Sequence, residues 1–256
     1  LFAISVVGLP DAAVKEARER VRAALRSNGI LLRGRIALNL APADLPKVGS
    51  LLDLPMAVGL AAESGAIPAG KPAIYLGELA MDGRLRSTKG AVAAALLARR
   101  KGLPLYLPPQ NAPEASLVKG VEIYAAPDLS SLLAHLKEDR PLSPFSETVP
   151  EEGEPPPECD LCDIKGQAAA KRALEIAAAG HHNILLVGSP GSGKTMLARA
   201  LRGILPPLTD EERLETMLVR STLGVRTNPG RSRPYRVVHH TASTIALCGG
   251  GTSLNP

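Results

Sequence analysis

One short segment restricts the fold of this chain more than any other part of its 256 residues. Residues 188–195 read Gly-Ser-Pro-Gly-Ser-Gly-Lys-Thr, which fits the pattern G-x-x-x-x-G-K-[ST] at every constrained position. An apolar run, Asn183–Val187, precedes the segment, and an amphipathic stretch, Lys194–Ile204, follows it. This order predicts a buried strand, a glycine-rich loop and a helix, the opening of a layered α/β domain.

The residue types of this loop suit a nucleotide phosphate. Glycine allows backbone N–H groups to converge on phosphate oxygens in conformations that a Cβ atom would oppose. The start of the following helix adds free N–H groups and the positive end of its dipole. Lys194 would supply a positive charge to the β- and γ-phosphates, and Thr195 a hydroxyl ligand for Mg²⁺, so both are predicted catalytic residues. The predicted cofactors are ATP and Mg²⁺, and the predicted cofactor-binding residues of the loop are Gly188, Ser189, Pro190, Gly191, Ser192, Gly193, Lys194 and Thr195.

Composition supports an α/β fold. Apolar residues make up 45% of the chain, which excludes wholesale disorder, whereas aromatic residues make up only 2%. A core of Ala, Leu, Val and Ile favours helices layered on a buried sheet. No apolar stretch approaches the roughly 18 to 20 residues of a membrane span, and the N-terminus lacks the features of a signal peptide. Three cysteines form no even disulfide framework, which predicts a cytoplasmic location.

The distribution of charge and proline predicts two domains. Residues 1–140 alternate strand-like and helix-like patterns and are expected to form one α/β domain. Residues 141–158 contain six prolines and five glutamates, which is typical of a solvated linker. Residues 159–256 contain the phosphate loop and are mildly basic, as are residues 1–140, so a nucleic-acid partner is permitted but not required.

Periodicity gives the expected elements of each part. The expected strands are 2–7, 36–40, 73–79, 105–107, 121–125 and 183–187. The expected helices are 11–27, 53–64, 88–101, 112–118, 128–137, 168–179, 194–204 and 208–218. Asp82-Gly83 predicts a hairpin turn. Thr209 and Glu212 predict a capping box at the start of the last helix.

One component of an ATPase is missing from the sequence. Hydrolysis needs an acidic residue at the end of a second strand, where it holds Mg²⁺ and polarises water. Downstream of Thr195 the acidic residues are Asp210, Glu211, Glu212 and Glu215, and no apolar strand precedes them. We therefore expect the chain to be part of a longer ATPase, truncated before this Walker B element, that binds ATP without hydrolysing it.

Longer motifs resemble a known family. The segment Asp163–Ala200 resembles the AAA+ ATPases related to the ATPase subunit of magnesium chelatase, in which a Gly-Gln box, here Gly166-Gln167, lies beside the adenine. The run RPYRVVHHTAS from Arg233, followed by Gly249-Gly250-Gly251, is similar to the RPFR-x-x-HHT-x-S…GGG signature of the ComM/YifB branch. The stretches SVVGLPDAAVKEARERVRAAL, RIALNLAPADLPKVG and LGELAMDGRLRSTKG are also close to that branch.

The resemblance implies a fold, an assembly and an activity. It implies a Lon-protease-like N-terminal α/β domain, the first part of a P-loop AAA+ domain, and a hexameric ring of identical subunits. ComM-like proteins resemble helicases that drive branch migration of DNA during recombination of incoming strands, so DNA is an expected partner and a membrane is not. Two alternatives remain: the magnesium chelatase ATPase subunit, which remodels a protein partner, and an ATP-binding scaffold without motor activity.

The same comparison predicts that the Lon-like domain is not a peptidase. The stretches matching the Lon serine and lysine motifs are Asp53-Leu54-Pro55-Met56-Ala57 and Lys89-Gly90-Ala91-Val92. Met56 stands where the serine would be and Val92 where the lysine would be, and neither side chain can act as nucleophile or base. Ser50 and Ser64 lie outside the matching frame, with no evident base in the sequence.

Two weaker patterns remain. The arginines that follow Glu215 are accompanied by no acidic residue, and Arg231, Arg233 and Arg236 are candidate contacts to DNA phosphates. A solvated loop, or a contact to the nucleotide of a neighbouring subunit, would explain the same pattern. Cys159-x-x-Cys162 and His239-His240 are each too few for the four ligands of a zinc site, so we interpret them as accidental pairs.

Overall fold

The computed structural model describes residues 3–8, 12–42, 49–68, 70, 72–146, 159–225, 230–239 and 241–245. The chain divides into two units by internal packing. Unit 1 consists of Leu1–Pro150 and Met217–Asn228, and unit 2 consists of Glu151–Thr216 and Pro229–Pro256. The first break falls inside the expected linker, whose residues 147–158 lie outside the described residues. The sequence did not indicate that 217–228 would group with unit 1.

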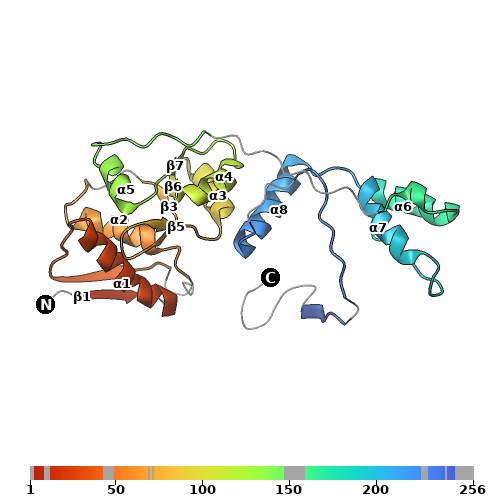
Figure 1. The fold of residues 1–256 in the computed structure, drawn as a ribbon, viewed down its shortest axis with the longest axis horizontal. Helices are drawn as coiled ribbons and strands as arrows, with labels where there is room; N and C mark the ends of the chain where they lie inside the picture. The colour runs from red at the N-terminus through yellow and green to blue at the C-terminus, as the bar shows by residue number, and fades with distance from the viewer. Residues whose placement is uncertain are drawn as a thin grey trace. The chain divides into compact units, whose positions relative to one another are not determined.

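Unit 1 alternates strands and helices, as its periodicity predicts (Figure 1). Its elements in chain order are β1 (Ala3–Val7), α1 (Ala12–Ser27), β2 (Arg35–Asn39), α2 (Asp53–Glu63), β3 (Ile74–Tyr75), β4 (Glu78–Leu79), β5 (Leu85–Arg86), α3 (Ala91–Lys101), β6 (Leu105–Leu107), the short 3₁₀ helix η1 (Pro109–Asn111), α4 (Ala112–Ser116), β7 (Ile123–Ala125) and α5 (Leu129–Leu136). The α/β fold class is therefore confirmed.

Three small sheets carry the strands of unit 1. β1 pairs with β2 in parallel, with Ala3 opposite Arg35. β6 lies between β3 and β7, and both pairings are parallel. β4 and β5 form an antiparallel hairpin at the predicted Asp82-Gly83 turn, where Gly83 has a φ of +90° that favours glycine. Helices that return the chain to the same edge connect the parallel strands, as this topology requires.

The core of unit 1 is aliphatic. α1 buries Val14, Ala17, Val21, Ala24 and Leu25, which fall at helical spacing on one face. That face packs on α2, and the two helices lie next to each other in Figure 1. The described helices include none with the length and apolar character of a membrane span.

One buried carboxylate joins three elements of this core. Asp53, at the start of α2, has no solvent exposure. The guanidinium of Arg20 on α1 donates to its two oxygens over 2.7 and 3.0 Å, and the N–H of Leu79 on β4 donates over 3.2 Å. Burial raises the pKa of the Asp53 carboxyl, and the hydrogen bonds from Arg20 and Leu79 oppose that rise. The carboxylate thus connects α1, α2 and β4.

A stack of aromatic rings lies across the sheet of β3, β6 and β7. The neighbours Tyr75, Tyr106 and Tyr124 stack with ring centroids 5.2 and 5.1 Å apart. His135 on α5 packs at an angle against Tyr106 and Tyr124, and its Nε2 lies 3.1 Å from the Tyr106 hydroxyl. Its Nδ1 accepts a hydrogen bond of 2.9 Å from the N–H of Leu142. Nδ1 of His135 must therefore be unprotonated for this hydrogen bond to the segment after α5 to form.

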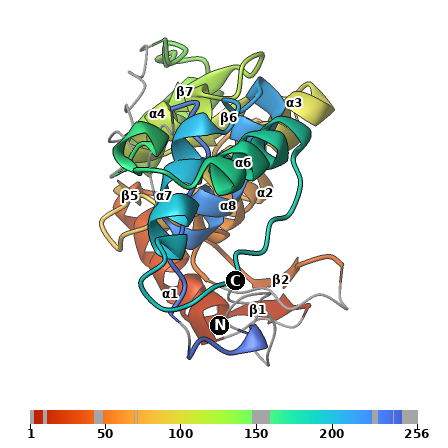
Figure 2. The same cartoon turned by 90° about the vertical axis from the view of Figure 1, so that its right-hand side faces the viewer.

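Unit 2 is built mainly from helices in its described part. Its elements are the 3₁₀ helix η2 (Leu161–Asp163), α6 (Ala168–Gly180), α7 (Lys194–Ile204) and the first half of α8 (Asp210–Leu223). α6 and α7 lie side by side in Figure 1 and in Figure 2. They bury Leu174, Leu197 and Ala200 against Ile164 in a small core.

Several expected boundaries were wrong. The expected strand 73–79 is two strands, because the chain turns between β3 and β4 to join different sheets. α3 begins at Ala91 rather than at 88, since Gly90 adopts a left-handed φ of +85°. α8 extends to Leu223, beyond the expected end at 218. Its predicted capping box is confirmed, because the Glu212 N–H donates to Thr209 Oγ1 and the Thr209 N–H donates to the Glu212 carboxylate.

The ion pair of Asp53 gives a stability prediction. Replacing Arg20 by Ala leaves a buried carboxylate without its charged partner, which we expect to cost about 3–5 kcal/mol of unfolding free energy. Arg22→Ala is the matched control: Arg22 pairs with Glu19 at the surface of the same helix, and its replacement should cost less than about 1 kcal/mol. Urea unfolding, followed by the near-ultraviolet circular dichroism of the stacked tyrosines, measures both. Equal losses in the two variants would contradict the prediction.

The neutral form of His135 gives a pH prediction. Burial lowers its pKa below the ordinary 6.5, so the contribution of neutral His135 is present above pH 6.5 and is lost as the pH falls from there to the folded pKa. His135 is the single histidine within the residue ranges of unit 1. The urea midpoint of the tyrosine signal should therefore fall between pH 7.5 and 5.5. His135→Gln keeps an acceptor but does not titrate, and an equally large fall in this variant would rule out His135 as the cause.

Candidate nucleotide-binding site

The phosphate loop has the backbone that its glycines predict. Gly191 and Gly193 have φ values of +78° and +86°, in the left-handed region that favours glycine. A Cβ atom at Gly188 would lie 3.2 Å from Ser192 Oγ, a tight contact within the loop. Helix α7 begins directly after Gly193, and its first internal bond runs from the Leu197 N–H to the Gly193 carbonyl. The N–H groups of the preceding turn have no carbonyl to bond within the helix, which is the arrangement that binds anions.

The ammonium group of Lys194 lies over this loop. Its Nζ donates to the carbonyl oxygens of Gly188 and Ser189 over 2.9 and 2.6 Å and lies 3.3 Å from Ser192 Oγ. A cation is thus held against the loop, beside the first turn of α7. Thr195 is the next residue of that turn and is exposed. A positive charge beside the free amide groups of a helix start is an arrangement that can bind the phosphates of a nucleotide.

The Gly-Gln box meets the phosphate loop. Gln167 Nε2 donates to the Ser192 carbonyl over 3.3 Å, although the two residues are 25 positions apart in the chain. Gly166 and Gln167 have φ values of +66° and +56°, and the left-handed region costs a non-glycine residue energy. Such strain concentrates at functional sites. The family resemblance implies that this box lies beside the adenine, and the structure shows its contact to the loop.

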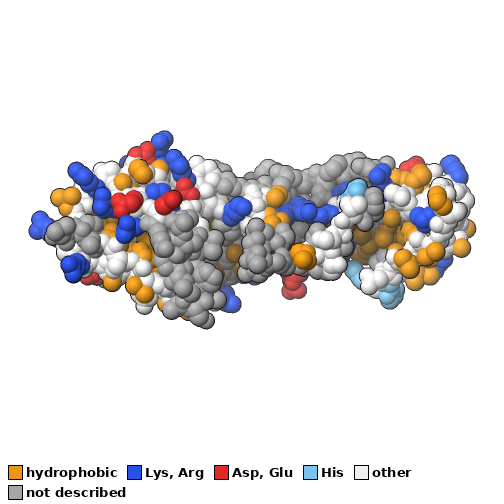
Figure 3. Space-filling view, turned by 90° about the horizontal axis from the view of Figure 1, so that it is seen from below, with side chains coloured by type: hydrophobic (Ala, Val, Ile, Leu, Met, Phe, Trp, Pro, Cys, Tyr) orange, Lys and Arg blue, Asp and Glu red, His pale blue; other side chains and the backbone are white. Residues whose placement is uncertain are grey.

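The strand expected before the loop is not formed. Residues 183–187 adopt no strand, and the described part of unit 2 contains no strand beside them. A strand exists only with a partner that accepts and donates its ladder of hydrogen bonds. The side chains of Leu185 and Val187 are 85% and 86% exposed, and Figure 3 shows hydrophobic side chains gathered on the surface of unit 2. The prediction of a buried strand at residues 183–187 was therefore wrong.

Two of the three arginines predicted to contact DNA have acidic partners. Arg231 pairs with Asp210 over 2.8 Å, and Arg233 pairs with Glu212 over 2.9 Å. The hydrogen bond from the Thr209 N–H and the pairing with Arg233 hold the pKa of Glu212 below its usual value. The charge pattern of the sequence did not predict these contacts, because each acidic residue precedes its arginine by 21 positions. Arg236 is exposed.

The cysteine and histidine pairs are the remaining candidates for metal ligands. Cys159 and Cys162 are free thiols at the start of η2, and a hydrogen bond to Asp160 raises the pKa of the Cys162 thiol. His239 Nδ1 lies 2.7 Å from Thr241 Oγ1, whereas His240 and Cys248 lie outside the described residues. Within the described ranges, no group of three or more His, Cys, Asp or Glu side chains could hold a metal ion.

The positions that match the Lon dyad lie in the core of unit 1. Met56 is 4% exposed and Val92 has no exposure. The N–H of Val92 donates to Ser221 Oγ on α8 over 3.3 Å. Ser50 Oγ donates to the carboxylate of Glu78, a contact that the sequence did not indicate.

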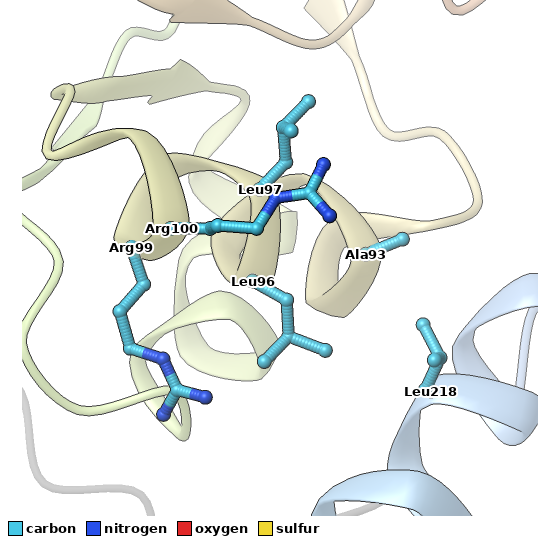
Figure 4. Close-up of a pocket in the computed structure, with 6 residues that line it drawn as sticks. All are labelled: Ala93, Leu96, Leu97, Arg99, Arg100 and Leu218. Atoms are coloured by element: carbon cyan, nitrogen blue, oxygen red, sulfur yellow. The ribbon is translucent and has the colours of Figure 1, made fainter.

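A shallow hollow on unit 1 lies between α3 and the second half of α8. Figure 4 shows Leu96 of α3 and Leu218 of α8 facing each other across it. The residues that line it are Ala93, Leu96, Leu97, Arg99, Arg100 and Leu218. The described residues that line it are apolar or basic.

Comparisons with known proteins indicate the family of the chain. The family model described as magnesium chelatase, subunit ChlI, matches residues 160–256, and the model described as subunit ChlI of Mg-chelatase matches residues 1–111. Two archaeal Lon proteases are 41% identical, one from Halobacterium salinarum over 56 residues and one from Archaeoglobus fulgidus over 63.

Longer matches cover nearly the whole chain. Competence protein ComM of Haemophilus influenzae is 44% identical over 260 residues, which is 98% of this chain and 51% of ComM. The uncharacterized protein YifB of Salmonella typhimurium is 43% identical over 254 residues, 97% of this chain and 50% of YifB. The chain thus spans about half the length of these relatives. On these grounds it belongs to the ComM/YifB family of magnesium chelatase-like AAA+ ATPases.

Proposed function

We propose that the protein is an ATP-driven motor that acts on DNA, of the kind that drives branch migration when incoming strands recombine. The observation that carries the nucleotide part is the phosphate loop. It has glycines with positive φ, leads directly into helix α7 and holds the Lys194 ammonium group against its carbonyl oxygens. The observation that supports the DNA part is the similarity to competence protein ComM of Haemophilus influenzae.

The proposal gives each residue of the site a role. The amide groups from Gly188 to Gly193 and the first turn of α7 bind the phosphate oxygens. Lys194 leaves the loop carbonyls and pairs with the β- and γ-phosphates, while the Thr195 hydroxyl is a Mg²⁺ ligand. Gly166 and Gln167 hold the nucleotide beside the loop. Bound Mg²⁺ neutralises the charge that develops on the transferred phosphoryl group.

Hydrolysis and assembly belong to the whole protein in this proposal. The acid that polarises water and the arginine finger lie in the remaining half of the relatives' length or on a neighbouring subunit. Strands from that half pair with residues 183–187 and form a sheet, on whose faces Leu185 and Val187 become buried. Six copies form a ring in the cytoplasm. Residues 1–140 act as a Lon-like domain without its dyad, 141–158 as a linker and 159–256 as the start of the AAA+ domain.

A second candidate is the magnesium chelatase ATPase subunit, which would remodel a protein partner. The descriptions of both matching family models favour it. The matches to Lon proteases favour the first candidate, because the chelatase subunit is not expected to carry a Lon-like domain. A scaffold that binds ATP without motor activity is the remaining alternative.

Nucleotide binding can be tested on residues 1–256. Lys194→Ala removes a charge-assisted contact worth about 1.5–3 kcal/mol, so we expect Mg²⁺-ATP to bind roughly 10- to 100-fold more weakly. Arg172→Ala is the control, since Arg172 is exposed in the same unit and pairs with Glu175. Isothermal titration calorimetry measures both variants. Unchanged affinity in Lys194→Ala, or ATP turnover by residues 1–256, would contradict the proposal.

The motor activity can be tested on the full-length protein. We expect forked DNA to raise its rate of ATP hydrolysis, and Lys194→Ala to abolish hydrolysis with or without DNA. Phosphate release is the measurement. An ATPase that forked DNA leaves unchanged would exclude the DNA motor, and an ATPase that only a protein partner stimulates would support the chelatase candidate.

A further inference from the structure

The segment Arg231–His239 of unit 2 is anchored at its first end. The Arg231 carbonyl accepts a hydrogen bond of 2.7 Å from the Leu208 N–H. The Arg233 side chain donates to the Pro206 carbonyl over 2.8 Å and pairs with Glu212. The Arg233 side chain is only 19% exposed, so it fixes the segment rather than contacting a ligand.

Beyond this anchor the described bonds of the segment are local. The Thr241 N–H donates to His239 Nδ1 over 3.3 Å, and the Ala242 N–H donates to the His239 carbonyl over 2.9 Å. Pro234 fixes its own φ and favours an extended conformation at Arg233, so the chain leaves the Arg233 anchor in a restricted direction.

After the anchor at Arg233, the side chains are exposed. Tyr235 is 42% exposed, and Arg236 beside it is also exposed. Tyr235 differs in this from the three tyrosines of unit 1, which stack on one another. An exposed aromatic ring next to an exposed guanidinium, directly after an anchored residue, offers the stacking surface and the positive charge with which proteins bind single-stranded nucleic acid.

Charge favours a polyanion as the occupant. The sequence contains no Asp or Glu after Glu215, so no acidic residue of the segment competes with a phosphate for Arg236. Asp210 and Glu212 neutralise Arg231 and Arg233, which leaves Arg236 as the exposed positive charge in the stretch that follows the anchor. A protein partner with an apolar surface would use Val237 and Val238 but would gain nothing from Arg236.

From this geometry we infer that Tyr235 and Arg236 form a binding site for single-stranded DNA. A base stacks on the Tyr235 ring, and the Arg236 guanidinium pairs with a backbone phosphate. Arg233 is a positioning residue that acts through Glu212. This inference rests on the proposed action on DNA and names the residues that would perform it. It changes the sequence-based prediction, which gave Arg231, Arg233 and Arg236 the same role.

The test is binding of a fluorescent oligothymidylate to residues 1–256 and to the full-length protein, followed by anisotropy at several salt concentrations. Tyr235→Ala should weaken binding about 5- to 100-fold, as expected for the loss of one stacked base, and Tyr235→Phe should bind like the wild type. Tyr235→Ala should leave the slope of log K against log salt unchanged, whereas Arg236→Ala should reduce it by about 0.7. Val238→Ala, in the same segment, and Arg100→Ala, in unit 1, are the matched controls.

The outcomes separate the inference from the proposed function. If the wild type binds DNA and Tyr235→Ala binds equally well, the inference is wrong and the DNA motor stands. Tighter binding to duplex than to single-stranded DNA overturns the inference in the same way. If neither single-stranded nor forked DNA binds the wild-type full-length protein, both the inference and the proposed DNA motor are wrong. Far-ultraviolet circular dichroism confirms that each variant is folded, which we expect because both side chains are exposed.

Discussion

The buried carboxylate of Asp53 is the contact on which the arrangement of unit 1 depends. A charge with no solvent exposure is tolerated only with full pairing, and Arg20 of α1 and the Leu79 N–H of β4 provide that pairing. Aliphatic side chains can slide against one another at little cost, whereas this bidentate contact fixes one register of α1 on α2. In a chain with 2% aromatic residues, such a polar contact supplies specificity that large rings supply elsewhere.

Unit 2 shows how much of a nucleotide site is local. The positive-φ glycines, the start of α7 and the position of Lys194 all lie within a few residues of one another, and they form without a completed sheet. The exposed side chains of Leu185 and Val187 mark the part that is not local. The strand that would bury them needs neighbours, and the described residues of unit 2 provide none. The sequence motif therefore gives the loop, and only tertiary pairing would give the strand.

The arginines illustrate the opposite case, in which composition alone misleads. A stretch without acids indicates a free basic surface, but Arg231 and Arg233 pair with acids that lie earlier in the chain. Those acids lie in the first turn of α8, and Glu212 also forms the capping box with Thr209. One short region therefore caps a helix and holds the following segment. Exposure then distinguishes Arg236 and Tyr235 from their neighbours, a difference that residue type does not reveal.

The sequence by itself determined most helices, the hairpin at Gly83, the capping box of α8 and the phosphate loop, because each depends on residues close together in the chain. It did not determine the pair of Arg20 and Asp53, the contact of Gln167 with Ser192, or the grouping of residues 217–228 with unit 1. Those contacts join residues that are distant in the chain, and no periodicity or spacing encodes which of them meet. Only the tertiary structure decided them, since burial and hydrogen bonding select partners after the local elements have formed.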